Sequence, residues 1–348
     1  MENILFLAFT EPDGGLHKTA FEAAGAAHEL SQQLGAALTV GLIGGEVQPA
    51  ANLLAASGAK ILAVSGSEFA QPRYATDAAA AEAICRAAAP TLVLVPSNSR
   101  SSRALPGVAF RLNGRVDTHV ATVANQNGVL AITRWYYRQR MEAVLSRAER
   151  PWFLLLEPGC HAPYAGAAGT ATVESVTVAL TDQLQRTTVT GQRVPQADQQ
   201  TIRPDAKLLF VAGAGWTKKQ PDGQTHVPEA EKLVLSFIRQ SSASLGSSKS
   251  LADQSGEGQA VFPFMTHLNQ VGQTGATPRH AKGLSTCCHG EEPHVVGWRF
   301  VNERRAVNLD PNCGWARGKA DVLYVADAFA VMVAVNALLE KKAGGAGA

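Results

Sequence analysis

Polar residues that could contact a flat, polar ligand are concentrated in one nearly uncharged stretch, LNQVGQTGAT at 268–277. Gln273 and Thr274 supply an amide and a hydroxyl group between Gly272 and Gly275. Glycine, asparagine and threonine are common in turns, so an ordinary loop would explain this composition. The alternative is a loop that runs close to a ligand, because glycine lacks the side chain that would collide with it.

A second candidate for ligand contact is the VAGAGW turn at 211–216, which follows an expected strand. Gly213 and Gly215 would let a pyrophosphate approach the backbone at the end of that strand. The motif lacks the third glycine and the distant acidic residue of a dinucleotide fingerprint. A plain strand-to-loop turn therefore stays open as the alternative.

The cysteines offer few metal ligands. Cys287 and Cys288 are adjacent and cannot easily bind one zinc ion, and the sequence contains no Cys-x-x-Cys pair. Cys160 and Cys313 are distant in sequence, so small buried thiols at a strand end are the simpler interpretation of 285–290. Five cysteines without a framework spacing are typical of a reducing cytoplasm.

The length and charge limit the class of protein. A chain of 348 residues suggests two domains, and a formal charge of +2 without a basic run gives no reason to expect nucleic acid or anionic lipid as a partner. The first apolar run is too short for a signal peptide, and no apolar stretch reaches 18 residues. We therefore expect a soluble, cytoplasmic protein that does not span a membrane.

Two arginine-rich segments have open interpretations. Residues 100–115 are expected to form a helix whose arginines face solvent, with a surface for a partner protein as the alternative. Residues 134–145 place three aromatic residues beside three arginines. This composition suits either a protein interface or a hairpin that packs on its neighbour.

Short apolar runs alternate with alanine-rich helical patterns in the first half of the chain. This repetition predicts a parallel sheet with right-handed crossovers. Residues 118–137 and 151–159 have a different pattern and predict antiparallel additions, with a turn at Asn127–Gly128. The buried parallel strands are expected at 4–9, 38–44, 60–66 and 91–97.

A second α/β unit is expected to begin with the apolar run at 206–216 and to include a helix at 227–241. The fold class is therefore α/β, with two domains that each contain a mostly parallel sheet flanked by helices. We expect the domain boundaries to be 1–175 for the N-terminal domain, 176–204 for a polar linker, 205–342 for the second domain and 343–348 for a disordered tail.

Several short motifs of the second half, in one order, resemble those of the α subunit of electron-transfer flavoproteins. They are VGQTG at 271–275, His294 with Gly297, VNLDP at 307–311 and VAD at 325–327. The resemblance extends over nearly the whole chain. It implies an N-terminal α/β domain that contacts a β subunit and a Rossmann-like second domain that binds FAD.

The resemblance also implies roles for individual residues. Thr274 would hydrogen-bond flavin N5, and His294 would lie near the flavin C2 carbonyl, where protein groups tune the electronics of the ring. Asn308 and Asp327 match residues that hold the adenosine half. The implied cofactor-binding residues are Gly213, Gly215, Ser248, Lys249, Gly272, Gln273, Thr274, Gly275, His289, Gly290, His294, Asn308 and Asp327.

Several positions depart from the family pattern. Ala214 stands where the family usually has arginine between the two glycines, and Lys249 stands where an arginine flanks the ring. His289 replaces a serine, and Pro293 replaces a glutamine and has no backbone N–H to donate. Residues 253–265 form an insertion. We therefore expect a divergent member whose flavin potential differs from the common form.

The expected function is that of an electron carrier without a catalytic acid, base or nucleophile. It would pair with a β subunit, take electrons from a flavin dehydrogenase and pass them to a membrane quinone reductase. One alternative is a flavin-free structural subunit of the same fold. Another is a nicotinamide-dependent dehydrogenase, which the incomplete glycine motif disfavours.

Overall fold

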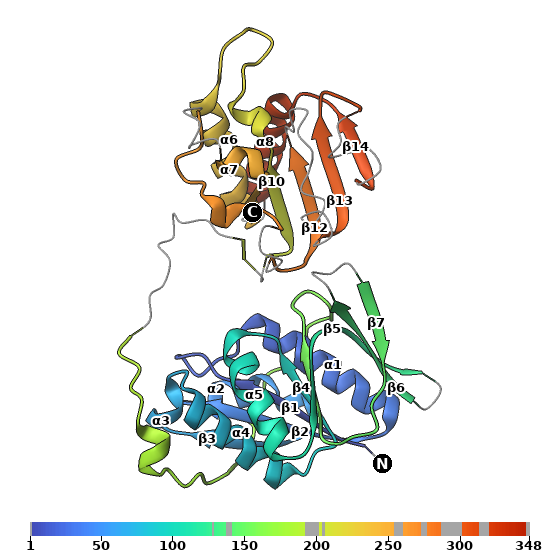
Figure 1. Ribbon diagram of the computed structural model, residues 1–348, viewed down its shortest axis with the longest axis vertical. Helices are drawn as coiled ribbons and strands as arrows, with labels where there is room; N and C mark the ends of the chain where they lie inside the picture. Colours follow the sequence, from blue (N-terminus) through green and yellow to red (C-terminus); the bar gives the residue numbers. More distant parts are fainter. Residues whose placement is uncertain are drawn as a thin grey trace. The chain divides into compact units, whose positions relative to one another are not determined.

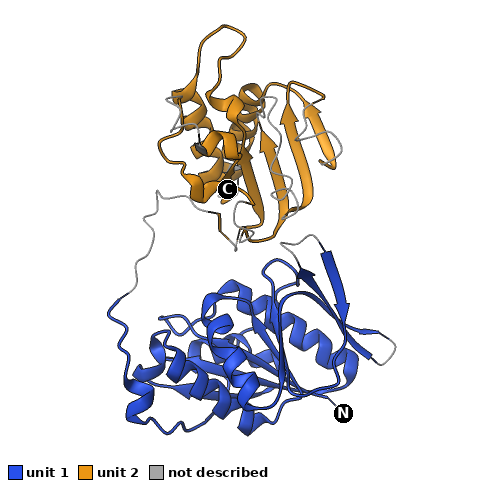
Figure 2. Cartoon of the chain, viewed as in Figure 1, with its two compact units in different colours: residues 1–136, 141–193 blue, residues 137–140, 194–348 orange. Residues whose placement is uncertain are grey.

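The computed structural model describes residues 2–126, 129–136, 141–191, 202–203, 206–253, 260–272, 277–286, 301–312 and 320–345. The chain divides into two compact units, Met1–Tyr136 with Met141–Arg193 and Tyr137–Arg140 with Val194–Ala348 (Figure 2). Each unit is built around one mostly parallel sheet flanked by helices (Figure 1). The expected α/β class with two such sheets is therefore confirmed.

The sheet of the first unit has the strand order β7-β6-β5-β8-β4-β1-β2-β3-β9. Among the described strands only the β5–β6 and β6–β7 pairs are antiparallel, and β5 and β6 lie on either side of residues 127–128, where the sequence predicts the turn. The strands are β1 (Asn3–Phe9), β2 (Ala37–Gly44), β3 (Lys60–Ser65), β4 (Leu92–Pro96), β5 (Arg115–Gln126), β6 (Val129–Tyr136), β7 (Met141–Leu145), β8 (Trp152–Leu156) and β9 (Val173–Ser175).

Strand β8 corrects the expectation that residues 151–159 add to the sheet in an antiparallel direction. It pairs in parallel with β4 on one side and with β5 on the other. All five of its residues are buried, which is typical of an interior parallel strand covered on both faces. An apolar run alone does not reveal direction, because direction depends on the path of the connecting chain.

Helices cover both faces of the first sheet. Alternate residues of β1 point to opposite faces, so Phe6 belongs to one apolar core and Leu7 to the other. The first core includes α1 and α2, and the second includes α3, α4 and α5. The helices are α1 (Lys18–Leu34), α2 (Gln48–Leu53), α3 (Ser67–Ala70), α4 (Tyr74–Ala88) and α5 (Ser99–Arg111), with short 3₁₀ turns at Ala55–Ser57 and Asp182–Gln185.

The chain that follows β9 stays against the first unit as far as it is described. The Val176 amide donates to the Ala63 carbonyl (2.7 Å), and Val178 packs on the second core of this unit. Further along, the Arg73 guanidinium donates to the carbonyl of Thr187 (2.9 Å). Residues 176–191 of the expected linker are thus attached to the first unit.

The sheet of the second unit is parallel throughout, in the order β11-β10-β12-β13-β14. Its strands are β10 (Leu208–Ala212), β11 (Ser244–Ser247), β12 (His280–Thr286), β13 (Val301–Asn308) and β14 (Val322–Val325). The helices are α6 (Val227–Ser241), α7 (Lys249–Asp253) and α8 (Ala328–Gly345), with 3₁₀ turns at Ala214–Thr217 and His267–Asn269.

Helices α6 and α8 pack on one face of this sheet. Ala230, Val234 and Phe237 of α6 are buried at helical spacing, as expected for a core-facing stripe. Met332 of α8 is fully buried in the same core. Helix α8 continues to Gly345 and so includes the first three residues of the expected tail at 343–348.

Candidate ligand site at the carboxyl edge of the second sheet

The strand order of the second unit predicts where a ligand binds. From β10 the chain proceeds to β11, which pairs with β10 on one side. The next strand, β12, pairs with β10 on its opposite side within the same sheet. In open α/β sheets, ligands bind outside the carboxyl ends of the strands at such a reversal of order. Because all five strands are parallel, their carboxyl ends lie along one edge (Figure 1). The sequence-predicted residues Gly213, Gly215, Ser248, Lys249, Asn308 and Asp327 follow or end strands at this edge.

The turn at Gly213 joins two neighbouring strands. The Gly213 amide donates to the Thr286 carbonyl at the end of β12 (2.9 Å). Trp216 is fully buried, and its Nε1 donates to the Thr286 hydroxyl (2.9 Å). Gly215 is also buried. The Gly213 amide is therefore used within the fold, so a phosphate contact at this turn would need other groups.

Ser248 immediately precedes the short helix α7. Its amide donates to the Ala212 carbonyl (2.9 Å), and its hydroxyl accepts from the Leu251 amide (3.2 Å). Lys249 is the first residue of α7. A serine in this position is a typical N-cap, so part of its hydrogen-bonding capacity supports the helix.

The stretch at 268–272 lies along β11. The Asn269 side chain donates to the Leu245 carbonyl (3.2 Å) and accepts from the Thr266 amide (3.1 Å). Gln270 forms a parallel bridge with Ser247 at the end of β11. A Cβ atom at Gly246 would collide with the next residue of this stretch, Val271. Glycine at 246 therefore allows the chain to approach the strand closely.

Thr277 is a residue that the sequence reasoning missed. It is 7% exposed, and its hydroxyl accepts a hydrogen bond from the amide of Gly272 (2.8 Å). Gly272 has a φ of 81°, in the left-handed region that favours glycine. This bond ties together the two ends of the segment 273–276. No sequence signal would reveal it, because threonine after a glycine-rich loop is common.

Asn308 and Asp327 both support the backbone at the far end of the edge. Asn308 is buried, and its side-chain amide donates to the Asp310 carbonyl (3.1 Å). One carboxylate oxygen of Asp327 accepts from the Ala330 amide (2.8 Å) and thereby caps the start of α8. Each side chain keeps further acceptor capacity, since an amide oxygen or a carboxylate accepts more than one hydrogen bond.

Six of the predicted site residues lie outside the described residues: Gln273, Thr274, Gly275, His289, Gly290 and His294. The same holds for Cys287, Cys288 and Cys313. Within the described ranges, no cluster of histidine, cysteine or acidic residues could hold a metal ion, and no helix has the length and apolar character of a membrane span. Burial, with a smaller effect of Glu82, raises the pKa of Cys85 to about 12.

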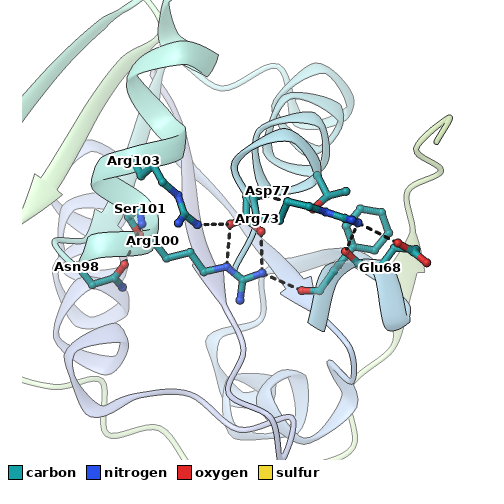
Figure 3. A network of polar contacts seen from close by, with 9 residues as sticks. Glu68, Arg73, Asp77, Asn98, Arg100, Ser101 and Arg103 are labelled. Atoms are coloured by element: carbon teal, nitrogen blue, oxygen red, sulfur yellow. Dashed lines mark hydrogen bonds and ion pairs between the residues drawn. The ribbon is translucent and has the colours of Figure 1, made fainter. Parts of the chain in front are cut away.

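Arg100 of α5 departs from the expectation of a solvated helix face, whereas Arg103 and Arg111 are exposed as expected. Arg100 binds the fully buried carboxylate of Asp77 through two hydrogen bonds (2.7 and 3.0 Å), and Arg103 adds a third (3.2 Å) (Figure 3). Arg100 also donates to the Phe69 carbonyl (2.8 Å), and its guanidinium lies 4.4 Å from the centre of the Phe9 ring. This ion pair lies within the first unit and is not a solvated face.

The second arginine-rich segment forms the hairpin of β6 and β7, with residues 137–140 outside the described ranges. Arg134 of β6 and Arg147 donate to the buried carboxylate of Asp117 on β5 (2.7 and 2.5 Å). The Trp152 indole donates to the same carboxylate (2.8 Å). Burial alone would raise the pKa of Asp117, but the donors Arg147, Trp152 and Arg134 outweigh it and lower the pKa.

Two buried polar atoms at the carboxyl edge test whether a nucleotide cofactor fits. Ser247 Oγ and Gln270 Oε1 are shielded from solvent, and no described residue hydrogen-bonds either atom. Native proteins usually satisfy buried polar groups, so such atoms indicate a missing partner. Together with the acceptors of Asn308 and Asp327, they fit a ligand that is rich in hydroxyl groups.

The fold and this edge define the class: a two-unit α/β protein whose second unit has an open parallel sheet with the reversal of strand order typical of nucleotide-binding proteins. The electron transfer flavoprotein domain pattern matches residues 4–181, just over half of the chain. Protein FixB of Clostridium saccharobutylicum is 26% identical over 304 residues, which cover 86% of this chain and 85% of that protein. The chain belongs to the electron transfer flavoprotein family, as a divergent member of the α-subunit type.

Proposed function

We propose that this chain is the FAD-carrying α subunit of a heterodimeric electron-transfer flavoprotein. It would take electrons from a flavin dehydrogenase and pass them to a membrane quinone reductase. The observation that carries the proposal is the carboxyl edge of the second sheet, which contains the reversal of strand order and along which Ser248 follows β11, Asn308 ends β13 and Asp327 follows β14. Family membership supports flavin as the ligand class.

When bound, the flavin supplies the redox chemistry, and the residues of this chain hold it and tune its potential. Asn308 and Asp327 would hold the adenosine half, because their remaining acceptors suit ribose hydroxyl groups. Ser248 would contact the cofactor beside the start of α7. By the family resemblance, Thr274 and His294 would contact the ring at N5 and near the C2 carbonyl.

A β subunit is the proposed partner, and exposed apolar side chains on the second unit support one. Val333 and Leu338 of α8 are 51% and 65% exposed, and Tyr324 and Val325 of β14 are 45% and 57% exposed. Contiguous exposed apolar patches often mark protein interfaces, and we propose that these side chains belong to such a patch. The isolated chain is then expected to melt at a lower temperature than the heterodimer, because binding stabilises the folded state.

The cofactor extracted from the heterodimer tests the proposal. The full chain is co-expressed with its β subunit, and the bound chromophore is released and identified. FAD in the amount of one per complex agrees with the proposal, whereas FMN or NAD contradicts it. A colourless, folded heterodimer would favour the flavin-free structural subunit, and binding of NADH without FAD would favour the dehydrogenase.

A further inference from the structure

The two unpartnered atoms at the carboxyl edge, Ser247 Oγ and Gln270 Oε1, belong to residues that lie side by side. Ser247 ends β11 and forms a parallel bridge with Gln270. Residues paired in this way point their side chains to the same face of the sheet. Ser247 is 1% exposed and Gln270 is 4% exposed. A buried polar group without a partner destabilises a protein, so the pair indicates a group that occupies this position in the functional complex.

The neighbouring residues of the edge differ from this pair. The Ser248 hydroxyl accepts from the Leu251 amide, the Gly213 amide donates to Thr286, and Asp327 accepts from the Ala330 amide. These three positions come from the family motifs, yet each already contributes hydrogen bonds to the fold. Ser247 and Gln270 are outside the residues that the motifs assign, and no described residue hydrogen-bonds their buried side-chain oxygens.

The chemistry of the pair limits the ligand group. Gln270 Oε1 only accepts hydrogen bonds, whereas a serine hydroxyl both donates and accepts. A phosphate oxygen cannot donate to an amide oxygen, so a phosphate does not satisfy Gln270 Oε1. A hydroxyl group fits, because it can donate to Gln270 Oε1 and also bond to Ser247 Oγ.

We infer that Ser247 and Gln270 form a subsite for a sugar or sugar-alcohol hydroxyl of the bound flavin nucleotide. This inference rests on the proposed function and adds two residues to the binding site. The ribityl chain and the adenosine ribose both carry such hydroxyls. A buried structural water would satisfy the same atoms and is the competing occupant.

The two occupants predict opposite effects of Ser247→Ala and Gln270→Met on the heterodimer. If a ligand hydroxyl is the partner, each variant removes an unsatisfied group from the FAD-free complex, whose melting temperature stays equal or rises. The same variants lose a hydrogen bond to FAD, so the dissociation constant for FAD should rise about 2- to 10-fold. A structural water instead predicts a lower melting temperature and unchanged FAD affinity.

Two further variants calibrate the measurement. Ser236→Ala on α6 removes a hydroxyl that accepts from Gln240 and should leave FAD affinity unchanged. Ser248→Ala should lower the melting temperature of the FAD-free complex, because it removes the cap of α7. Parallel titrations with FMN and AMP locate the hydroxyl on the ribityl chain or on the ribose.

The outcomes separate the two proposals. If the parent complex binds FAD and both variants bind it with unchanged affinity, the proposed subsite is wrong, but the proposed function is not contradicted. A parent complex that binds no flavin overturns both. Reduced FAD affinity in both variants without loss of stability in the FAD-free complex establishes the subsite.

Discussion

The carboxyl edges of the two sheets have the same strand reversal but different hydrogen bonding. In the first unit β1 lies between β2 and β4, as β10 lies between β11 and β12 in the second. Arg100, which follows β4, covers the ring of Phe9 at the end of β1 and binds the buried Asp77 (Figure 3). The guanidinium of Arg100 and the carboxylate of Asp77 at the first edge therefore bind one another.

The second edge instead leaves Ser247 Oγ and Gln270 Oε1 without described partners. The first edge also has such an atom, Ser101 Oγ in α5, but there Arg100 and Asp77 bind each other. The comparison teaches that topology alone does not assign a ligand site. Side chains that satisfy each other stabilise the fold, whereas side chains that remain unsatisfied leave capacity for a ligand.

The largest expected loss of stability is that of Asp77→Ala, which removes the buried carboxylate at the first edge. The substitution leaves Arg100 buried without its carboxylate, because its side chain is only 14% exposed. Breaking a buried ion pair by removing one partner costs about 3–5 kcal/mol. Urea denaturation measures the loss of unfolding free energy, and hydrogen exchange of the native protein, analysed for peptides from the first unit, locates it.

Arg103→Ala is the matched control for Asp77→Ala. The Arg103 side chain is 45% exposed, so its bond to Asp77 should contribute about 1 kcal/mol or less. Equal losses of unfolding free energy in the two variants would show that the exposure of an arginine side chain does not determine how much its bond to Asp77 contributes. A loss below about 1 kcal/mol for Asp77→Ala would contradict the view that the first edge is held by this pair.

The second prediction concerns Asp117, the other buried carboxylate of the first unit. Its pKa lies below the ordinary 3.8 in the folded protein, so its contribution is present above about pH 3.8 and is lost as pH falls through the folded value. Asp117→Asn should cost about 1.5–3 kcal/mol at pH 7, since it weakens charge-assisted bonds. The difference from the parent should shrink below pH 4, which denaturation at several pH values measures.

Much of the fold follows from the sequence, because apolar periodicity is a local signal. The helix expected at 227–241 matches α6, and the run at 4–9 matches β1 within one residue. The site is less predictable. The pairing of Arg100 with Asp77 and the Gly272–Thr277 bond depend on how separate segments meet, and periodicity carries no information about such contacts. Glycines and capping residues are recognisable by type, but the unsatisfied state of Ser247 Oγ requires coordinates.

A third prediction tests the close approach at the second edge. In Gly246→Ala the new Cβ would collide with Val271, a stiff β-branched residue. Overpacking of this kind costs about 1–3 kcal/mol and should displace the stretch that contains Gln270. Melting of the heterodimer and its FAD affinity should both fall. Gly344→Ala, where a Cβ meets nothing within 4 Å, should change neither; equal effects would refute a specific role for Gly246.

The smallest effect is expected for the bond between Gly272 and Thr277, which holds together the ends of segment 273–276. Thr277→Val removes the acceptor with little change of shape and should cost about 0.5–1.5 kcal/mol. Hydrogen exchange at the Gly272 amide should accelerate in the FAD-free heterodimer. Thr277→Ser keeps the hydroxyl and should restore slow exchange, whereas equal exchange in all three proteins would contradict the bond.

The same variant connects this bond with the proposed flavin site. If Thr274 contacts flavin N5, Thr274→Ala should shift the potential of a flavin couple by some tens of millivolts. A tenfold change in the equilibrium constant of a one-electron couple corresponds to 59 mV, and a net hydrogen bond of about 1 kcal/mol changes that constant by slightly less than tenfold. Thr277→Val acts only through the position of the segment, so its shift should be smaller and should return to the parent value in Thr277→Ser. Thr225→Ala, an exposed threonine of the same unit, is the matched control and should leave the couple unchanged. A shift for Thr277→Val that Thr277→Ser does not reverse would mean that packing at residue 277, and not its hydroxyl, sets the position of the segment.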